Sequence, residues 1–424
     1  MPRVAVHTLG CKVNQYESER IANDFRARGF DVVDFKDCAD VYIINTCTVT
    51  GVADGKSRQA ARGAALRNPE AKIVLTGCYA ERSGDEIQGV SLIVGNGAKD
   101  RLAEIVCSRL SLNPDANGSS GGSRVPGRTR ALLKIQDGCD QFCSYCAVPF
   151  ARPEMWSKEY PSLMDEARLL RDCGYKEIVL TGIRVGRYSD GEKDLADVLE
   201  GLASIDGIER VRLSSIELTD IPRRLMPLMA ENRKICRHLH IPLQSGDDET
   251  LDRMHRPYTT YDFGAFVDKS RIAVSGLAIT TDIMVGFPGE TREAFERSRA
   301  FCEKMEFARS HVFRYSPRPG TAAEGMSGAV STEEKERRSS SLIESTRRAS
   351  EAFAKRLIGE RVAVLVEGKE IRPGRRSGLT DNYVRVVFPA NEKLIGSIVD
   401  VRVVEVVDGV GIGRVEDSDM DRKR

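Results

Sequence analysis

Three closely spaced cysteines carry the clearest chemical signal in this chain of 424 residues. Cys139, Cys143 and Cys146 form a C-x3-C-x2-C spacing directly after a predicted strand. Three thiolates over this short span can hold one [4Fe–4S] cube and leave its fourth iron open to another ligand. A structural zinc site is the alternative, but such sites use four closed ligands, and the chain has no second C-x2-C. The spacing therefore predicts an iron–sulfur cluster with one open iron.

Three further cysteines share a different feature, since each follows a predicted strand. They are Cys11 after Val4–Leu9, Cys47 after Val41–Asn45, and Cys78 after Ile73–Thr76. In an open parallel sheet the carboxyl ends of the strands meet in a ligand crevice, where three thiols could hold a second cube. The alternative is that these are unrelated cysteines near strand ends. The other cysteines match no ligand spacing, and we expect them to be packing residues: Cys38, Cys107, Cys173, Cys236 and Cys302.

The segment that must position the second set of cysteines alternates strands with helices. Besides the three strands above, Leu92–Val94 is a short apolar run, and Gln15–Arg28 and Ala53–Arg67 have helical patterns. This alternation predicts an α/β fold over residues 1–110, with an open parallel sheet and helices on both faces. A Gly/Ser-rich stretch follows, and residues 111–130 are predicted to be a linker.

The middle of the chain repeats the strand–helix pattern six times. Its predicted strands are Leu132–Gln136, Glu177–Thr181, Val211–Ser215, His238–Pro242, Ile279–Val285 and Val312–Tyr315. Six such units predict a partial (β/α)6 barrel, which with a charged helix at Thr332–Leu357 makes a domain over residues 131–357. Residues 358–424 change to Val/Ile runs with Gly and Pro turns, which predicts a small all-β barrel.

Polar residues and glycines at the ends of the barrel strands are expected to line a cofactor pocket, because barrel enzymes bind ligands at this end. The set comprises Gly182, Arg184, Ser214, Glu217, Gln244, Asp282 and Gly286. Any single polar residue of this set is nearly as likely to cap the next helix, so the prediction depends on the set.

Composition restricts the partners only weakly. The chain has 64 basic and 63 acidic residues and a formal net charge of +1, which neither requires nor excludes a nucleic acid. No apolar run is long enough for a signal peptide or a membrane span, so we expect a cytoplasmic protein without a membrane partner. Basic and aromatic residues in the tail suit RNA contact, with a solvated charged surface as the alternative: Arg372, Arg375, Arg376, Tyr383, Arg385 and Phe388.

The first cysteine loop resembles the signature of the radical S-adenosylmethionine superfamily, in which an aromatic residue precedes the last cysteine. That residue is Tyr145 here. The resemblance implies that S-adenosylmethionine binds the open iron and is cleaved by one electron to methionine and a deoxyadenosyl radical. Tyr145 and the strand-end set would then bind this cofactor.

Longer strings resemble the methylthiotransferases within this superfamily. They are Leu9–Ser18, Asn45–Val49, Gly77–Ala80, His240–Gly246 and, similar to the RNA-binding TRAM module, Gly378–Tyr383 and Gly396–Val401. The resemblance implies two [4Fe–4S] clusters, the second of which carries or passes on sulfur. It also implies a tRNA partner, an electron donor and a sulfur source, and the sequence does not identify the last two.

Within this family, Gly10–Ser18 and the Asp140–Tyr145 loop resemble the bacterial branch that modifies N6-threonylcarbamoyladenosine beside the tRNA anticodon. Other branches modify isopentenyladenosine at the same place or an aspartate of a ribosomal protein. Two rivals from other classes are a non-catalytic iron–sulfur protein that binds tRNA and a zinc-stabilised RNA-binding module. Pro153 stands where the family has glycine, and Arg184 where it has histidine or asparagine, so both departures concern the geometry of cofactor binding.

Overall fold

The computed structural model describes residues 1–83, 87–112 and 128–416. The chain forms two compact units whose limits differ from the predicted domains. The first unit comprises Met1–Ser123, Gln136–Trp156 and Ser316–Glu324, so the C-x3-C-x2-C loop belongs with the N-terminal sheet. The second unit comprises the other segments and joins the barrel strands to the tail. Most of the predicted linker, residues 113–127, lies outside the described residues.

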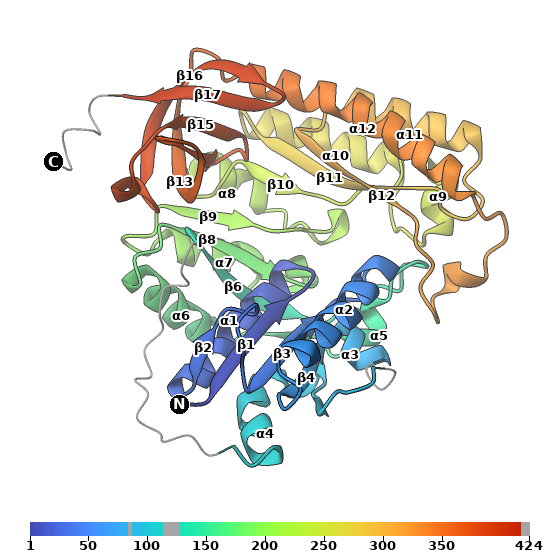
Figure 1. The fold of residues 1–424 in the computed structure, drawn as a ribbon. Coiled ribbons are helices and arrows are strands. Elements are labelled where there is room, and N and C mark those ends of the chain that lie inside the picture. The colour runs from blue at the N-terminus through green and yellow to red at the C-terminus, as the bar shows by residue number, and fades with distance from the viewer. Residues whose placement is uncertain (84–86, 113–127, 417–424) are drawn as a thin grey trace. The chain divides into compact units, whose positions relative to one another are not determined.

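The N-terminal sheet of the first unit has five strands in the order β2-β1-β3-β4-β5, all paired in parallel (Figure 1). Its elements are β1 (Arg3–Thr8), α1 (Lys12–Ala27), β2 (Asp31–Val33), β3 (Val41–Thr46), α2 (Gly51–Arg67), β4 (Lys72–Gly77), α3 (Cys78–Ser83), β5 (Leu92–Ile93), η2 (Asn96–Arg101) and α4 (Leu102–Arg109). The sequence pattern predicted every strand of this sheet except the short β2. The open parallel α/β fold expected for this segment is confirmed.

Apolar runs explain why these strands lie in the middle of the first unit. In β3 every residue is buried, and its side chains alternate between two separate cores. Ile43 faces the core that α1 and α4 cover, whereas Tyr42 and Ile44 face the core that contains α2. A strand buried on both faces needs a continuous apolar run rather than an alternating one. The helices therefore cover both faces of the sheet, as predicted.

The second unit contains the barrel strands. They lie in two sheets, β7-β6-β8-β9 and β10-β11-β12. Two isolated parallel bridges join the sheets: Val211 of β9 pairs with Ile235, just before β10, and Ser215, just after β9, pairs with His240 at the end of β10. The strands are β6 (Arg130–Asp137), β7 (Trp156–Ser157), β8 (Glu177–Gly182), β9 (Arg210–Leu213), β10 (His238–His240), β11 (Ala278–Val285) and β12 (Arg309–Arg314). The six predicted barrel strands are all present, which confirms the partial barrel.

Helices follow most of these strands, and those of the second unit pack against the strands in one large core. The helices of this part of the chain are α5 (Val148–Ala151), α6 (Tyr160–Asp172), η3 (Val185–Arg187), α7 (Leu195–Ala203), η4 (Leu218–Asp220), α8 (Leu225–Glu231), α9 (Asp248–Arg253), α10 (Thr260–Ala273), α11 (Arg292–Met305), η5 (Ala322–Gly325) and α12 (Thr332–Lys355). Of these, α5 and most of η5 belong to the first unit. Local sequence sets several starts: Asp194 and Asp197 form a capping box at α7, as Thr259 and Asp262 do at α10. Figure 1 shows α11 and α12 side by side along β11 and β12.

The tail forms a closed five-stranded barrel in the order β13-β14-β15-β17-β16, as predicted. Its elements are β13 (Arg361–Arg372), β14 (Arg375–Thr380), β15 (Arg385–Pro389), η6 (Glu392–Leu394), β16 (Ile398–Val407) and β17 (Val410–Val415). Its core of valines and Phe388 also receives Phe353 from α12 and Ala278 from β11. This shared core explains why the barrel and the tail make one compact unit.

Candidate active site

The three separated cysteines lie at one edge of the N-terminal sheet. Cys11 directly precedes α1, Cys47 follows β3, and Cys78 begins α3 directly after β4. Strands β1, β3 and β4 are neighbours and run in parallel, so their carboxyl ends meet at the same edge. The structure therefore brings together three residues that the sequence separates by more than thirty positions each.

Gly10 lets two of these cysteines approach each other. A Cβ atom at Gly10 would lie 2.7 Å from Sγ of Cys47, and the φ angle of +94° is one that side chains rarely adopt. The pKa of Cys47 is raised to about 11, mainly by burial and also by the neighbouring Cys78 and Cys11 thiols. Three clustered thiols whose ionisation is mutually unfavourable are stabilised as thiolates by a bound metal, which makes this donor set fit an iron–sulfur cluster.

A buried charged network surrounds Cys78. Arg152 donates from Nε to Sγ of Cys78 at 3.4 Å, and its other nitrogens donate to Glu17 at 2.8 and 2.9 Å and to Asp137 at 2.6 Å. Lys99 donates to the same Glu17 at 2.6 Å. The Arg152 side chain is only 2% exposed. Burial alone would lower the pKa of Arg152, but Glu17, Cys78 and Asp137 raise it well above its usual value, so the guanidinium stays charged.

Two asparagines complete the setting of the separated cysteines. Asn14 donates to the carbonyls of Leu9 and Thr46 at 2.8 and 2.9 Å, and it accepts a hydrogen bond from Arg152 at 3.1 Å. Asn45 donates to the carbonyl of Asn14 at 2.9 Å. These bonds link the two loops that carry Cys11 and Cys47. Sequence reasoning did not identify the roles of Asn14, Asn45, Glu17, Lys99 or Arg152, because no local spacing connects them.

The C-x3-C-x2-C loop belongs to the same unit and is held by backbone bonds. The N–H of Cys139 donates to the carbonyl of Arg152 at 3.2 Å, and the N–H of Cys146 donates to the carbonyl of Cys143 at 3.0 Å. The N–H of Gln141 points to Sγ of Cys139 at 3.4 Å, and the N–H of Val148 to Sγ of Cys146 at 3.5 Å. Such N–H to sulfur contacts support thiolates that bind iron.

The residues on either side of Pro153 contact the cysteine loop and the helix after it. The residue before it, Arg152, donates its N–H to the carbonyl of Val148 at 2.8 Å and so ends α5. The residue after it, Glu154, passes so close to Gly138 that a side chain there would clash with the Glu154 carbonyl. The departure from the family pattern therefore lies in an exposed segment, residues 153–156, whose backbone passes close to the cysteine loop at Gly138. Tyr145, predicted beside the cofactor, is partly buried in the turn before Cys146.

In the second unit, several predicted pocket residues lie at or just after strand ends. Ser214 follows β9, and its buried hydroxyl has no hydrogen-bond partner within the described part of the chain. Gln244 has a φ angle of +69°, and its N–H donates to the carbonyl of Asp282 at 2.8 Å. Gly182 ends β8 and is partly exposed. An unsatisfied buried hydroxyl is costly, so Ser214 is well suited to a polar ligand.

The other predicted pocket residues are already engaged by protein groups. Gly286 donates its N–H to Glu290 at 2.6 Å. Glu217 forms an ion pair with Arg256. Arg184 holds Asp220 with two hydrogen bonds, at 2.5 and 2.9 Å. The Arg184 guanidinium thus fixes the turn after β8 to the turn after β9, and its role in cofactor binding stays a prediction.

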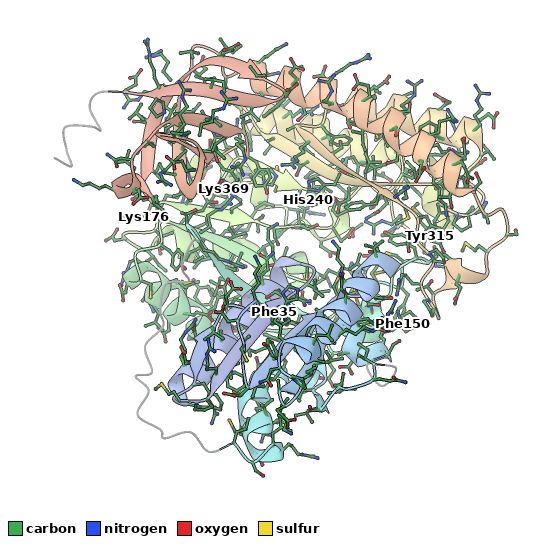
Figure 2. The ribbon with its side chains drawn as sticks, viewed as in Figure 1. Phe35, Phe150, Lys176, His240, Tyr315 and Lys369 are labelled. Carbon is green, nitrogen blue, oxygen red and sulfur yellow. The ribbon has the colours of Figure 1, made fainter. Side chains whose placement is uncertain are left out.

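Asp282 lies between two imidazoles. Its Oδ1 atom is 3.3 Å from Nε2 of His240 and 3.2 Å from Nδ1 of His311 (His240 is labelled in Figure 2). Burial would raise the pKa of Asp282, but hydrogen bonds and charge from the two histidines outweigh it and hold that pKa far below its usual value. The Asp282 carboxylate is therefore ionised, and the structure gives it two partners that sequence reasoning did not assign.

The predicted RNA-contacting set divides in two. Arg376 is buried and donates to the carbonyl of Gly368, and Phe388 lies in the core of the tail barrel. Tyr383 stacks on His238 with ring centroids 4.3 Å apart. The buried Arg376 and Phe388 hold the fold together, which corrects their predicted role, whereas RNA contact by the partly exposed Tyr383 stays a prediction. The others remain available on the surface: Arg372 and Arg375 are exposed, and Arg385 is partly exposed although it pairs with Glu367.

The remaining cysteines mostly match the packing prediction. Cys236 and Cys302 are buried, and Cys107 and Cys173 are partly buried. Cys38 is exposed, so for this residue the prediction was wrong. It lies in the irregular loop between β2 and β3, where the neighbouring Ala39, and not Cys38, enters the core that contains α2.

Comparisons with known proteins agree with this arrangement. Three family models match successive segments: the uncharacterized protein family UPF0004 over residues 3–95, the radical SAM superfamily over residues 133–302, and the TRAM domain over residues 355–415. The solved structure of a radical S-adenosylmethionine methyltransferase, TsrM from Kitasatospora setae with cobalamin and a [4Fe-4S] cluster bound, has a TM-score of 0.57 and 15% identity. It covers 88% of this chain and 80% of that one, which shows a shared fold.

Curated relatives match over almost the whole chain. The threonylcarbamoyladenosine tRNA methylthiotransferase MtaB of Bacillus subtilis (strain 168) is 40% identical, over 96% of this chain and 94% of that protein. The MtaB of Thermotoga maritima is 39% identical, over 95% and 94%. A tRNA-2-methylthio-N(6)-dimethylallyladenosine synthase of Methylacidiphilum infernorum is 32% identical, over 96% and 93%. Within the described residues, no helix has the length and apolar character to cross a membrane.

Proposed function

Because this chain belongs to the radical S-adenosylmethionine tRNA methylthiotransferases, we propose that it converts N6-threonylcarbamoyladenosine next to the tRNA anticodon into its 2-methylthio derivative. The observation that carries this proposal is the pattern of identity over nearly the full chain. Relatives named for the threonylcarbamoyl substrate share 34–40% of the residues, whereas relatives named for the dimethylallyl substrate share 32–33%. A methylthiotransferase for the dimethylallyl substrate is therefore the less favoured alternative.

The proposed metal ligands are two sets of three cysteines in the first unit. Cys139, Cys143 and Cys146 would hold one [4Fe–4S] cluster, and Cys11, Cys47 and Cys78 the other. The donor chemistry fits: each set offers three thiols, and N–H groups already point at two of the sulfurs in the first set. When bound, the clusters and S-adenosylmethionine supply a deoxyadenosyl radical, a methyl group and sulfur, which together can functionalise an aromatic C–H bond.

The protein's own groups prepare this chemistry by holding ligands in place. Arg152 keeps a positive charge against Cys78 and, through its carbonyl, holds the N–H of Cys139. Because it contacts a cysteine from each set, we assign Arg152 as a positioning residue for both. Its burial also keeps water away from Cys78, and a charged donor in a dry environment is worth more than one in water.

The second unit would bind S-adenosylmethionine and RNA. We propose that Tyr145 of the cysteine loop and a strand-end set bind the cofactor: Gly182, Ser214, Glu217, Gln244 and Gly286. The backbone carbonyl of Asp282 holds Gln244, while its carboxylate is engaged by histidines. For tRNA, the exposed Arg372 and Arg375 and the partly exposed Arg385 are the proposed phosphate contacts. The reaction needs an external electron donor and a sulfur source, and we place it in the cytoplasm.

The test is a nucleoside analysis of tRNA from a bacterial host that lacks its own enzyme for this modification. Expression of the chain should convert N6-threonylcarbamoyladenosine to the 2-methylthio form, measured by liquid chromatography and mass spectrometry. The triple variant Cys139→Ala/Cys143→Ala/Cys146→Ala should form none. If the dimethylallyl nucleoside is converted instead, the substrate assignment is wrong. If neither nucleoside changes and S-adenosylmethionine is not cleaved in vitro, the chain is a non-catalytic iron–sulfur protein.

A further inference from the structure

Three potential metal ligands gather on neighbouring strands of the second unit. They are His240 at the end of β10, Asp282 in β11 and His311 in β12. Asp282 pairs in register with His311, and His240 pairs with Thr280, two residues before Asp282. Residues two apart on a strand face the same side of a sheet. All three side chains therefore project from one face, and their ligand atoms lie within 4.8 Å of one another.

The spacing of these atoms is long for hydrogen bonds between charged groups and is compatible with a coordinated ion. Oδ1 of Asp282 is 3.3 Å from Nε2 of His240 and 3.2 Å from Nδ1 of His311. A hydrogen bond from a charged imidazole to a carboxylate is shorter, at about 2.7–2.9 Å. In a tetrahedral zinc site with bonds of about 2.0–2.1 Å, neighbouring ligand atoms are about 3.3–3.4 Å apart. The two observed distances match this tetrahedral edge.

The surrounding protein orients the ligands as metal sites require. Nδ1 of His240 is 2.9 Å from the hydroxyl of the buried Thr280, which leaves Nε2 directed at Asp282. A second partner of this kind fixes the ring and the tautomer of a metal-binding histidine. On the opposite face of the strands, Leu239 and Ile283 are fully buried in the core, so the backbone that carries the ligands is firmly held.

One side of the group is open. The side chains of His240, Asp282 and His311 are 15, 26 and 44% exposed, so access increases toward His311. Structural zinc sites have four closed ligands, whereas three protein ligands with an open position are typical of zinc sites that bind an exchangeable ligand. Two imidazoles and one carboxylate also differ chemically from the thiolate sets of the first unit, because they offer only nitrogen and oxygen donors.

We propose that His240, Asp282 and His311 bind a Zn²⁺ ion that keeps one open coordination position. The site requires neither the iron–sulfur ligands nor the identity of the tRNA substrate, and it stands or falls separately from the proposed function. A bound Zn²⁺ gives this face of the barrel strands a Lewis acid for an oxygen ligand, either water or an anionic group of a substrate.

The test uses the full chain with its clusters reconstituted, so that the thiols are occupied. The protein is equilibrated with Zn²⁺ without oxygen, freed of excess ion and analysed for zinc per chain and by zinc X-ray absorption. The wild type should hold one zinc with nitrogen and oxygen neighbours at about 2.0–2.1 Å. His311→Asn should bind zinc about 100-fold more weakly or not at all, since even losing a supporting contact costs 10–100-fold. His255→Asn is the matched control, because His255 is exposed and its φ angle of +56° suits asparagine.

Two results would overturn the proposal. One is equal zinc content in the wild type and in His311→Asn. The other is a zinc shell at about 2.3 Å, which would show sulfur ligands and place the ion at the cysteines. His311 is largely exposed, so its substitution should leave the fold intact, and an unchanged melting temperature without zinc checks this. Asp282→Asn should also abolish binding, and if that variant fails to fold, His311→Asn decides alone.

Discussion

Among the described residues, Arg152 is the only cation that donates a hydrogen bond to Cys78. Replacing Arg152 by methionine removes this cation, while the methionine still fills the buried space with a long side chain. The network of Arg152, Lys99, Glu17 and Asp137 holds two positive and two negative charges. The substitution leaves Lys99 paired with Glu17 at 2.6 Å, and the net charge of the group changes from zero to −1. A buried carboxylate then lacks its charged partner.

The expected loss follows from that unpaired charge. Breaking a buried ion pair from one side costs about 3–5 kcal/mol. For a unit of this size each kcal/mol corresponds to about 2–4 °C, so the first unit should melt about 6–20 °C lower than in the wild type. Because the extra negative charge lies beside Cys78, iron bound by the separated cysteines should also be lost faster.

The assay separates these two effects. Arg152→Met is placed in the Cys139→Ala/Cys143→Ala/Cys146→Ala background, so that all bound iron reports on the other three cysteines. Thermal unfolding is followed without oxygen, and iron release to a chelator is timed.

Arg338→Met is the matched control, since Arg338 is an equally buried arginine paired with the buried Glu290 in the second unit. It should destabilise the protein to a similar degree but leave iron release unchanged. If Arg152→Met melts within about 2 °C of its parent, or if both variants release iron at the same rate, the assigned role of the network is wrong.

Three further results are expected. Gly10→Ala should reduce the iron content of the reconstituted protein from about eight to about four atoms per chain, because the new Cβ atom would lie 2.7 Å from Sγ of Cys47. Gly55→Ala is the control and should retain about eight iron atoms, because a Cβ atom at Gly55 would meet nothing within 4 Å. Arg375→Ala should weaken tRNA binding and reduce the slope of its salt dependence by about 1, whereas the buried Arg376→Ala should lower thermal stability and leave that slope unchanged. Burial would raise the pKa of Glu177, but the nearby arginines outweigh that effect and lower it. The ionised Glu177 carboxylate therefore stabilises the folded protein above the unfolded-state pKa of about 4.3, and this stabilisation is lost as the pH falls toward the pKa of the folded state. Glu177→Gln should flatten the pH dependence of the melting temperature below about pH 5, and an unchanged profile would contradict this assignment.

Much of the fold could be read from local sequence. Hydrophobic periodicity is a property of neighbouring residues, so the buried strands β1, β3 and β4 and the six barrel strands were predicted with small errors at their ends. The three-residue β2 was missed because a strand that short has too little pattern to detect. The limits of the two compact units were not predictable in this way, since such units depend on which segments pack together.

In the candidate site, too, local features could be predicted from the sequence and non-local ones could not. The C-x3-C-x2-C spacing is local, and the positions of Cys11, Cys47 and Cys78 after parallel strands needed only the topology rule that strand ends meet at one edge. The roles of individual arginines were not local. Arg152, Arg184 and Arg376 look alike in sequence, yet one holds a cysteine, one holds Asp220 and one holds a hairpin carbonyl.

The sequence by itself determined the ligand types, the order of the strands along the chain and the family to which the chain belongs. Only the tertiary structure decided which polar side chains are buried together. It placed Glu17, Lys99 and Asp137 around Arg152 from three separate segments, and it brought His240 and His311 to either side of Asp282. The physical reason is that hydrophobic burial has a short period along the chain, whereas the pairing of a buried charge depends on whichever group the fold brings within about 3 Å.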